Sequence, residues 1–382
     1  MEEINYATIG FIAGIILLAC LHGLLLAGIF FFHRRLNTRS SQYLALATLG
    51  MSIILGYEFI FWLELDQRVD SWLLYIVPYL RTTIPMGLYG LVIFLLHPDH
   101  QFSSFEKLGF ASIGLEFLIE LVYIPVDLYV TDPEQLDLTE GWLTLFGWFL
   151  SIVVALVFIP RALRKVVHYQ KYLFDHYSTT DRKSLRWLQN FLILFLVMSV
   201  FWIISFLFYL IEDYDSGDLV FLIVTVGLVI LLFWIGYFLM LNYHWFQIAQ
   251  IPAEEEEKTP STAKLSANTK QYHQHLLSLM REEKVYEDVH LTLEHLAERL
   301  EISSGYLSQI IKENEQKTFF EFINDFRVEA VKAKLIDPEY QHYTIMGIAS
   351  ECGFNSKSTF NAVFKKFTNE TPSAYQKRHL VS

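Results

Sequence analysis

Four ionisable side chains lie inside long apolar runs of the sequence: Glu58, Arg81, Glu116 and Glu120. A charge at the centre of a bilayer costs at least roughly 2–3 kcal/mol, so such residues usually face the interior of a helix bundle and find partners there. At about 1.5 Å per helical residue, Arg81 and Glu120 lie at nearly the same depth. We therefore predict an Arg81–Glu120 pair, which either lines a ligand cavity open to the outside or only fixes the register of the helices.

A second group of candidate residues belongs to an internal repeat near the C-terminus. Two segments align residue by residue: Leu291–Ser304 and Tyr343–Ser356. In each copy a threonine, Thr292 or Thr344, can cap a short helix, because its hydroxyl accepts a hydrogen bond from a free backbone N–H. Ser303 or Asn355 can cap the helix that follows in the same way. The repeat therefore predicts two helix-turn-helix units.

The second helix of each unit would lie in the major groove of DNA, where polar side chains reach base edges. Gln309 and Asn361 carry amide groups suited to adenine. The alternative is that these residues are only the exposed face of a helical core. The predicted base contacts are Ser304, Gly305, Ser308, Gln309 and Lys312 in the first unit and Ser356, Lys357, Ser358 and Asn361 in the second, with Lys365 and Lys366 as phosphate contacts.

A single helix, about Thr318–Leu335, is predicted between the two units. Its apolar residues follow the spacing of one buried stripe, and the pair Asp337-Pro338 ends it. A rigid helix of this length can hold two reading helices about one DNA turn apart, roughly 34 Å. The residues of the stripe are Phe319, Ile323, Phe326 and Ala330.

These motifs closely resemble the DNA-binding domain of the AraC/XylS family of transcriptional regulators, over about Tyr272–Arg378. The sequence departs from that family at Gln316 and Asn369, where glycine is common. The resemblance implies a double helix-turn-helix fold, binding to double-stranded promoter DNA, activation of transcription through RNA polymerase, and a homodimer. It rests on Leu291–Ala297, Ser303–Ser308, Phe319–Arg327, Ala330, Leu335, Ile348-Ala349, Gly353–Ser356, Phe360, Phe364–Phe367 and Thr371–Tyr375.

Before this domain, apolar runs alternate with short polar interruptions, and a helix needs about twenty residues to cross the hydrocarbon core of a bilayer. The composition agrees, with 53% hydrophobic and only 18% charged residues. We expect an all-α protein in which a bundle of seven membrane-spanning helices precedes the double helix-turn-helix domain. The predicted spans are Ala7–Phe32, Tyr43–Leu63, Trp72–Leu96, Leu108–Val130, Trp142–Pro160, Trp187–Ile211 and Leu219–Leu241.

The orientation of the spans follows from their basic flanks, which stay in the cytoplasm. Arg34, Arg35 and Arg39 follow the first span and a larger basic group follows the fifth, whereas the opposite loops collect acidic residues. The N-terminus is therefore expected outside and the C-terminal domain in the cytoplasm. By resemblance the membrane is the inner, cytoplasmic membrane of a bacterium.

Two segments join the predicted parts. The basic segment Arg161–Arg186 is predicted to be an amphipathic helix on anionic lipid headgroups. The acidic run Glu254–Glu257 lies in a stretch too polar to build a core. The expected domains are a sensor over residues 1–245, a flexible linker over 246–270 and a DNA-binding domain over 271–382.

Charge agrees with this division only when it is resolved by region. The net charge of −12 argues against an unstructured basic tail that binds nucleic acid. The acidity sits mainly in the predicted outer loops and the linker. The second half of the C-terminal domain is basic and would supply much of the attraction for phosphate.

The function expected from the sequence is a membrane-embedded, one-component transcription regulator that senses an unknown ligand. No nucleophile, phosphate-binding or metal-ligand motif stands out, and the two cysteines lie far apart, so we expect no enzymatic activity, cofactor or metal. One alternative makes the spans a transporter or a lipid-modifying enzyme with an attached DNA-binding domain, because intramembrane carboxylates could relay protons. Another makes them only an anchor.

Overall fold

The computed structural model describes residues 6–33, 38–63, 80–129, 133–180, 184–211, 214–242 and 269–380. These residues are helical and contain no β-strand, only an isolated antiparallel bridge between Tyr177 and Thr292. The chain forms two compact units. The first contains Met1–Val167 and Leu185–Ile251, and the second contains His168–Ser184 and Pro252–Ser382.

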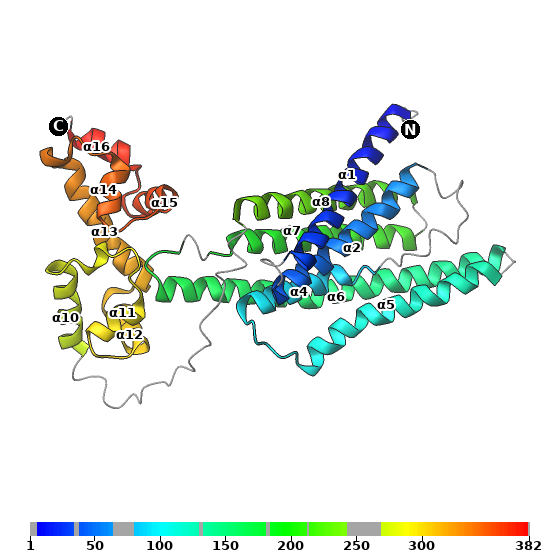
Figure 1. Cartoon of the computed structure of the whole chain (residues 1–382), viewed down its shortest axis with the longest axis horizontal. Coiled ribbons are helices and arrows are strands. Elements are labelled where there is room, and N and C mark those ends of the chain that lie inside the picture. The colour runs from blue at the N-terminus through cyan, green and yellow to red at the C-terminus, as the bar shows by residue number, and fades with distance from the viewer. Residues whose placement is uncertain are drawn as a thin grey trace. The chain divides into compact units, whose positions relative to one another are not determined.

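The helices of the first unit follow the apolar runs of the sequence, and each predicted span overlaps one of them. A helix over Pro133–His176 continues from the first unit into the second. In chain order the helices are α1 (Tyr6–Phe32), α2 (Arg39–Trp62), α4 (Thr83–Leu96), α5 (Ser104–Tyr129), α6 (Pro133–His176), α7 (Arg186–Leu210) and α8 (Tyr214–Asn242) (Figure 1).

Four helices in the described part are long and apolar enough to cross a membrane: Gly10–Phe32, Arg39–Ile60, Leu145–His176 and Arg186–Phe208. Two further apolar helices, Thr83–Leu96 and Leu222–Phe238, are shorter. The third predicted span begins at Trp72, but residues 64–79 lie outside the described part. The prediction of seven spans therefore stays a prediction.

The first unit exposes many large apolar side chains. Phe11, Leu18 and Leu25 of α1 are 70%, 64% and 62% exposed. Among the described residues of the second unit only Ile336 and Tyr343 belong to this class. Water-soluble proteins rarely expose large contiguous apolar surfaces. The two units therefore have surfaces of opposite character.

Small residues bring α2 and α4 into close contact. A Cβ atom added at Gly87 would lie 2.7 Å from the backbone nitrogen of Ala47 and 2.7 Å from the carbonyl oxygen of Tyr43. Only glycine allows this approach, which is a common device where helices pack by van der Waals contact. Polar side chains nearby are satisfied by their own helix, because Ser52 Oγ donates to the Thr48 carbonyl oxygen at 2.7 Å.

The segment after the fifth predicted span differs from the prediction. Arg161–His176 is helical as predicted, but it is the last part of α6, which continues through Pro160, and residues 177–180 are not helical. Residues 181–183 of the predicted range lie outside the described part. A proline costs a helix interior about 3 kcal/mol or more, but here its neighbours Ile159 and Ala162 are completely buried, and their packing offsets that cost. The sequence-based boundary at 245 leaves His168–Ser184 in the membrane domain, whereas the structure groups it with the C-terminal residues.

The second unit consists of two helical groups with α13 between them (Figure 1). The first core gathers side chains of α10 to α13 and the second gathers side chains of α13 to α16, so α13 belongs to both. The helices are α10 (Thr269–Arg281), α11 (Leu293–Arg299), α12 (Ser304–Glu315), α13 (Phe319–Ile336), α14 (Ile345–Glu351), α15 (Lys357–Thr368) and α16 (Pro372–Leu380), with the 3-10 turns η2 (Val285–Glu287) and η3 (Pro338–Tyr340). The predicted linker lies mostly outside the described residues.

Candidate nucleic-acid interface

The first helix-turn-helix unit is α11 followed by α12. Thr292 caps α11 by accepting a hydrogen bond from the backbone N–H of His295 at 3.1 Å. Ser303 caps α12 by accepting from the N–H of Tyr306 at 3.3 Å. Both caps are those that the sequence predicts, and they fix where each helix begins. The completely buried Leu296 and the nearly buried Ala297 join α11 to the first core.

The second helix-turn-helix unit repeats this arrangement with α14 and α15. Thr344 caps α14 by accepting from the N–H of Gly347 at 3.0 Å. The cap of α15 is Ser356, which accepts from the N–H of Thr359 at 3.2 Å, and not Asn355 as predicted. Both residue types are good caps and they are adjacent, so the sequence alone cannot choose between them.

The joining helix α13 begins and ends where the sequence predicts. Thr318 and Glu321 form a capping box, in which each side chain accepts a hydrogen bond from the backbone N–H of the other residue. Asp337 ends the helix and caps the turn η3, which begins with Pro338. Of the predicted stripe, Phe319 and Ile323 are buried, while Phe326 and Ala330 are partly buried against the same core.

The predicted base contacts of the first unit lie at the start and along one side of α12. Gly305, Gln309 and Lys312 are exposed, and Ser304 and Ser308 are half-buried. The amide nitrogen of Gln309 donates to Glu313 Oε1 at 2.7 Å. Gln309 must therefore exchange this bond for one to a base if it reads DNA.

The predicted base contacts of the second unit have the same exposure on α15. Lys357, Ser358 and Asn361 are exposed. The hydroxyl of Ser356 accepts the capping bond and also lies 3.2 Å from that of Ser358. Ser356 therefore acts first as a helix cap, and the base contact predicted for it would come on top of that role.

The two lysines predicted to contact phosphate are both exposed, but they differ in their surroundings. Lys366 Nζ lies 2.8 Å from Glu321 Oε1, which joins α15 to the start of α13. The hydrogen bond from Lys366, together with those from Thr318, holds the pKa of Glu321 below its usual range, against the opposing effect of burial. Part of the positive charge of Lys366 is thus already neutralised, which makes Lys365 the stronger candidate for phosphate.

Both reading helices end in a residue with left-handed backbone conformation. Gln316 closes α12 with φ 55° and ψ 30°, and Asn369 closes α15 with φ 60° and ψ 9°. These are the two positions where glycine is common in the resembled family. Asparagine tolerates this conformation better than other side chains do, whereas glutamine has no such advantage.

A buried arginine lies where the two helix-turn-helix units meet, and sequence reasoning missed it. Arg327 on α13 is completely buried. Its Nε donates to the carbonyl oxygen of Tyr286 at 2.7 Å, and its Nη2 donates to that of Asp288 at 2.8 Å. Its guanidinium also lies 5.9 Å from the centre of the ring of Phe354, which belongs to the second helix-turn-helix unit. The available signal was a charge on the buried side of α13, one turn after Ile323.

Burial lowers the pKa of Arg327 to about 10, and the nearby Asp288 acts in the opposite direction. The guanidinium therefore stays charged at neutral pH, in a site where every N–H group without a partner is costly. Gly353 makes room for it, because a Cβ atom there would lie 2.7 Å from Arg327 Nε and 2.5 Å from the Tyr286 carbonyl oxygen. Its φ of +91° also favours glycine.

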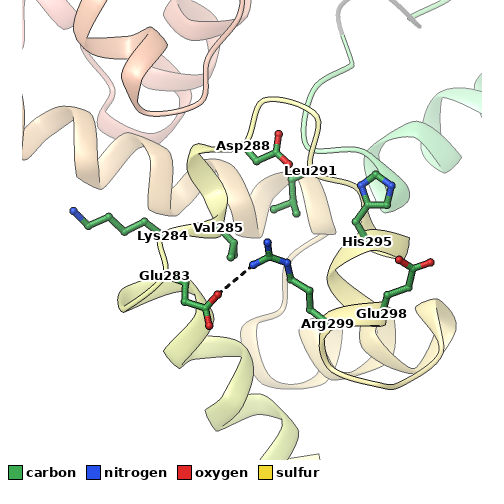
Figure 2. A pocket seen from close by; sticks show the side chains of 8 residues that line it. All are labelled: Glu283, Lys284, Val285, Asp288, Leu291, His295, Glu298 and Arg299. Carbon is green, nitrogen blue, oxygen red and sulfur yellow. Dashed lines mark hydrogen bonds and ion pairs between the residues drawn. The ribbon is translucent and has the colours of Figure 1, made fainter.

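A groove of about 710 Å³ lies beside the first helix-turn-helix unit, between the end of α10, η2 and α11. Figure 2 shows Glu283 and Arg299 reaching toward each other across it, with Arg299 Nη1 3.2 Å from Glu283 Oε2. Both side chains are more than half exposed, so this pair contributes little stability. The groove carries both signs of charge and lacks the uniformly positive lining expected of a phosphate site.

In the first unit of the structure, the predicted Arg81–Glu120 pair is present, with 3.4 Å between Nη1 and Oε1. Glu116 accepts hydrogen bonds from the backbone N–H groups of Arg81 and Thr82 at 2.9 and 2.8 Å, where α4 begins. A carboxylate at a helix N-terminus satisfies free N–H groups and the helix dipole. Glu58 Oε2 accepts a hydrogen bond from the Thr225 hydroxyl at 3.5 Å.

Helix α6 approaches the same group at a glycine. A Cβ atom added at Gly147 would lie 3.2 Å from Arg81 Nη1 and 3.9 Å from Glu116 Oε1. The structure therefore brings together three of the four ionisable residues that the sequence singled out. Within the described part of the chain, His, Cys, Asp and Glu side chains form no group of three that could hold a metal ion.

Comparison with known proteins bears on the C-terminal part of the chain. Residues 296–378 match the family model described as a helix-turn-helix domain. An uncharacterized HTH-type transcriptional regulator of Staphylococcus aureus is 33% identical in a 108-residue alignment that covers 26% of this chain and 14% of that protein. The melibiose operon regulatory protein of Escherichia coli is 31% identical over 90 residues, which are 24% of this chain and 29% of that protein.

Among solved structures, the C-terminal domain of AraT, a response regulator from Geobacillus stearothermophilus, is 27% identical. That match covers 31% of this chain and 91% of the other, with a TM-score of 0.26. This chain spans less than a third of the length of each of these two regulators. The C-terminal part of the chain is an AraC-type helix-turn-helix domain, the kind that binds DNA in transcription regulators.

Proposed function

We propose that this protein is a membrane-embedded, one-component transcription regulator. Its C-terminal domain binds promoter DNA in the cytoplasm with both helix-turn-helix units, and its N-terminal helices respond to a signal on the membrane side. The observation that carries the DNA-binding half is the pair of capped units, whose reading helices α12 and α15 present exposed polar side chains.

Two observations support membrane embedding of the first unit. Four of its helices have the length and composition of membrane spans. Its helices also expose many large apolar side chains that lipid would cover, whereas the described residues of the second unit expose only two, Ile336 and Tyr343. Seven spans, an outside N-terminus and a location in the inner membrane of a bacterium complete the proposal, together with a homodimer that contacts RNA polymerase.

The buried group around Arg81 supports a sensory role for the first unit. Arg81, Glu116 and Glu120 join the start of α4 to α5, and Gly147 of α6 lies against them. A ligand that competes for one of these charges would change how the three helices pack. Such a ligand could shift the equilibrium between two arrangements of these helices only if it bound one arrangement more tightly than the other.

The salt dependence of DNA binding tests the DNA-binding half. Lys365→Ala should weaken binding about equally on all sequences and lower the slope of log K against log salt by about 1, because one phosphate contact is lost. Gln309→Ala should relax the preference at one base position and leave the slope unchanged. Lys332→Ala is the control, because Lys332 belongs to α13 and not to a reading helix, and it already pairs with Glu329 at 2.7 Å. A loss confined to one sequence in Lys365→Ala would contradict its assignment.

A further inference from the structure

A short segment from the N-terminal half of the chain is built into the second unit. We call Phe174–Thr180 the docking segment. Tyr177 forms the antiparallel bridge with Thr292. The backbone N–H and the Oγ of Ser178 both donate to the carbonyl oxygen of Leu291, at 3.3 and 2.7 Å. The docking segment thus pairs with the residues that lead into α11 of the first helix-turn-helix unit.

The docking segment also contacts the helix that joins the two units. The ring of Phe174 packs edge-on against Phe320 of α13, with 5.1 Å between the ring centres. Phe320 belongs to the core of the second helix-turn-helix unit, and Phe174 packs against that core. Asn324 of α13 donates from Nδ2 to the carbonyl oxygen of Ser178 at 3.1 Å. The docking segment therefore touches both halves of the DNA-binding domain.

Through Arg327, the docking segment becomes part of the buried junction between the two helix-turn-helix units. Its Nη1 donates to the carbonyl oxygen of Ser178 at 3.1 Å, and its Nη2 donates to Ser178 Oγ at 3.1 Å. The other acceptors are the carbonyl oxygens of Tyr286 and Asp288. Ser178 itself is only 1% exposed. Without the docking segment, Arg327 would lose two of its four acceptors in a buried site.

We propose that the docking segment couples α6 to the DNA-binding domain, and that its docked position is the one competent to bind DNA. This inference rests on the proposed function. Helix α6 runs without a break to His176, so a shift of α6 along its axis acts directly on the docking segment. Docking leaves the predicted reading residues Gln309 and Asn361 exposed. It also completes the hydrogen bonds of Arg327, which hold the two helix-turn-helix units together.

A disulfide tests whether the segment docks in the intact protein. Cβ atoms of a directly opposed antiparallel pair lie about 4.5–5.5 Å apart, close enough for a disulfide after small shifts. The full chain carrying Tyr177→Cys and Thr292→Cys should form this disulfide in lipid nanodiscs under mild oxidation, as detected by mass spectrometry of its peptides. The matched control is Tyr177→Cys with Thr344→Cys, at the equivalent cap of the second unit, which should not form one. If the two double-cysteine variants formed their disulfides to the same extent, or if neither formed one, the docking would be overturned.

DNA binding by the same locked protein tests the coupling. On a duplex that carries a site found by genome-wide mapping, the oxidised protein should bind at least as tightly as the reduced protein. Ser178→Ala should bind about five-fold or more weakly, with an unchanged salt slope. Ser278→Ala is the control and should bind like the parent protein, because the Ser278 hydroxyl donates to the His275 carbonyl oxygen of its own helix, α10. Weaker binding of the locked form, or unchanged binding by Ser178→Ala, would overturn the coupling. Absence of DNA binding by the parent protein would refute the proposed function and the coupling with it, while an absent disulfide would refute the docking alone.

Discussion

At the scale of single residues, the buried junction around Arg327 depends on a glycine. Gly353→Ala should destabilise the DNA-binding domain by about 2–4 kcal/mol, because the new methyl group meets two backbone carbonyl groups and the positive φ disfavours it. Gly305→Ala is the matched control, since a Cβ atom there meets nothing within 4 Å. Hydrogen exchange of α13 and α15 amides in the full chain measures the difference. Equal protection in the two variants would contradict this role of Gly353.

The left-handed C-cap of α12 is a second site where one residue sets local stability. Gln316→Gly should stabilise α12 by about 0.5–1 kcal/mol, because a left-handed conformation costs a residue with a side chain roughly 1–2 kcal/mol and glycine loses part of this gain to its greater freedom when unfolded. The measurement is hydrogen exchange of the last α12 amides. Slower exchange is expected, and faster exchange would show that the Gln316 side chain, which donates to the Glu313 carbonyl at 3.3 Å, outweighs the strain.

The thiol of Cys352 provides a test that depends on pH. Burial raises its pKa to about 11, although the nearby Lys334 acts in the opposite direction. Only the thiolate reacts with alkylating agents, so the folded protein should leave Cys352 unlabelled at pH 8 and label it only as the pH approaches 11 or when the domain unfolds. Mass spectrometry after brief alkylation reads this out. Rapid labelling at pH 8 would show that the second core is open.

At the scale of elements, α13 is tied to the second reading helix by the pair Glu321–Lys366. The pKa of Glu321 is lowered in the folded protein, so its contribution to stability is present above the ordinary glutamate pKa of about 4.3 and is lost as the pH falls through the lower, folded value. Glu321→Gln should therefore reduce the loss of α15 protection between neutral pH and pH 3. A double-mutant cycle with Lys366→Met isolates the pair, and an additive result would mean that the pair contributes nothing.

The helices of the DNA-binding domain could be predicted from the sequence because their signals are local. Thr292, Ser303, Thr318 and Thr344 each stand directly before a helix, and a hydroxyl at that position caps it. The choice of Ser356 over Asn355 was beyond the sequence, because adjacent residues can both cap. Pro160 misled the prediction of α6, since a proline usually ends or kinks a helix and here packing overrides that preference.

The buried junction could not be predicted, because its partners are distant in the sequence. Arg327 and Ser178 are 149 residues apart, and no periodicity or spacing links them. The pairing of Arg81 with Glu120 was within reach, because two opposite charges in predicted spans at equal depth have few other partners. The part that Glu116 plays at the start of α4 was not, since it depends on where α4 begins.

At the scale of the whole molecule, the proposed topology places the two ends of the chain on opposite sides of the membrane. Reporter enzymes fused before Met1 and after Ser382 should be active outside and inside the cell, respectively, because the basic flanks fix the orientation. Arg81→Glu with Glu120→Arg tests the sensory proposal in the same cells. A swap that keeps the response to the signal unaltered would leave the pair only a structural role.

The central claim is that one chain sits in the membrane and reads DNA with two helix-turn-helix units. Genome-wide mapping of DNA crosslinked to the full-length protein, recovered from the membrane fraction, tests it most directly. We predict discrete binding sites, each with two short motifs about one helical turn apart, and their loss when Gln309→Ala and Asn361→Ala are combined. Uniform recovery of DNA without discrete sites, or sites recovered only with protein from the soluble fraction, would contradict the account.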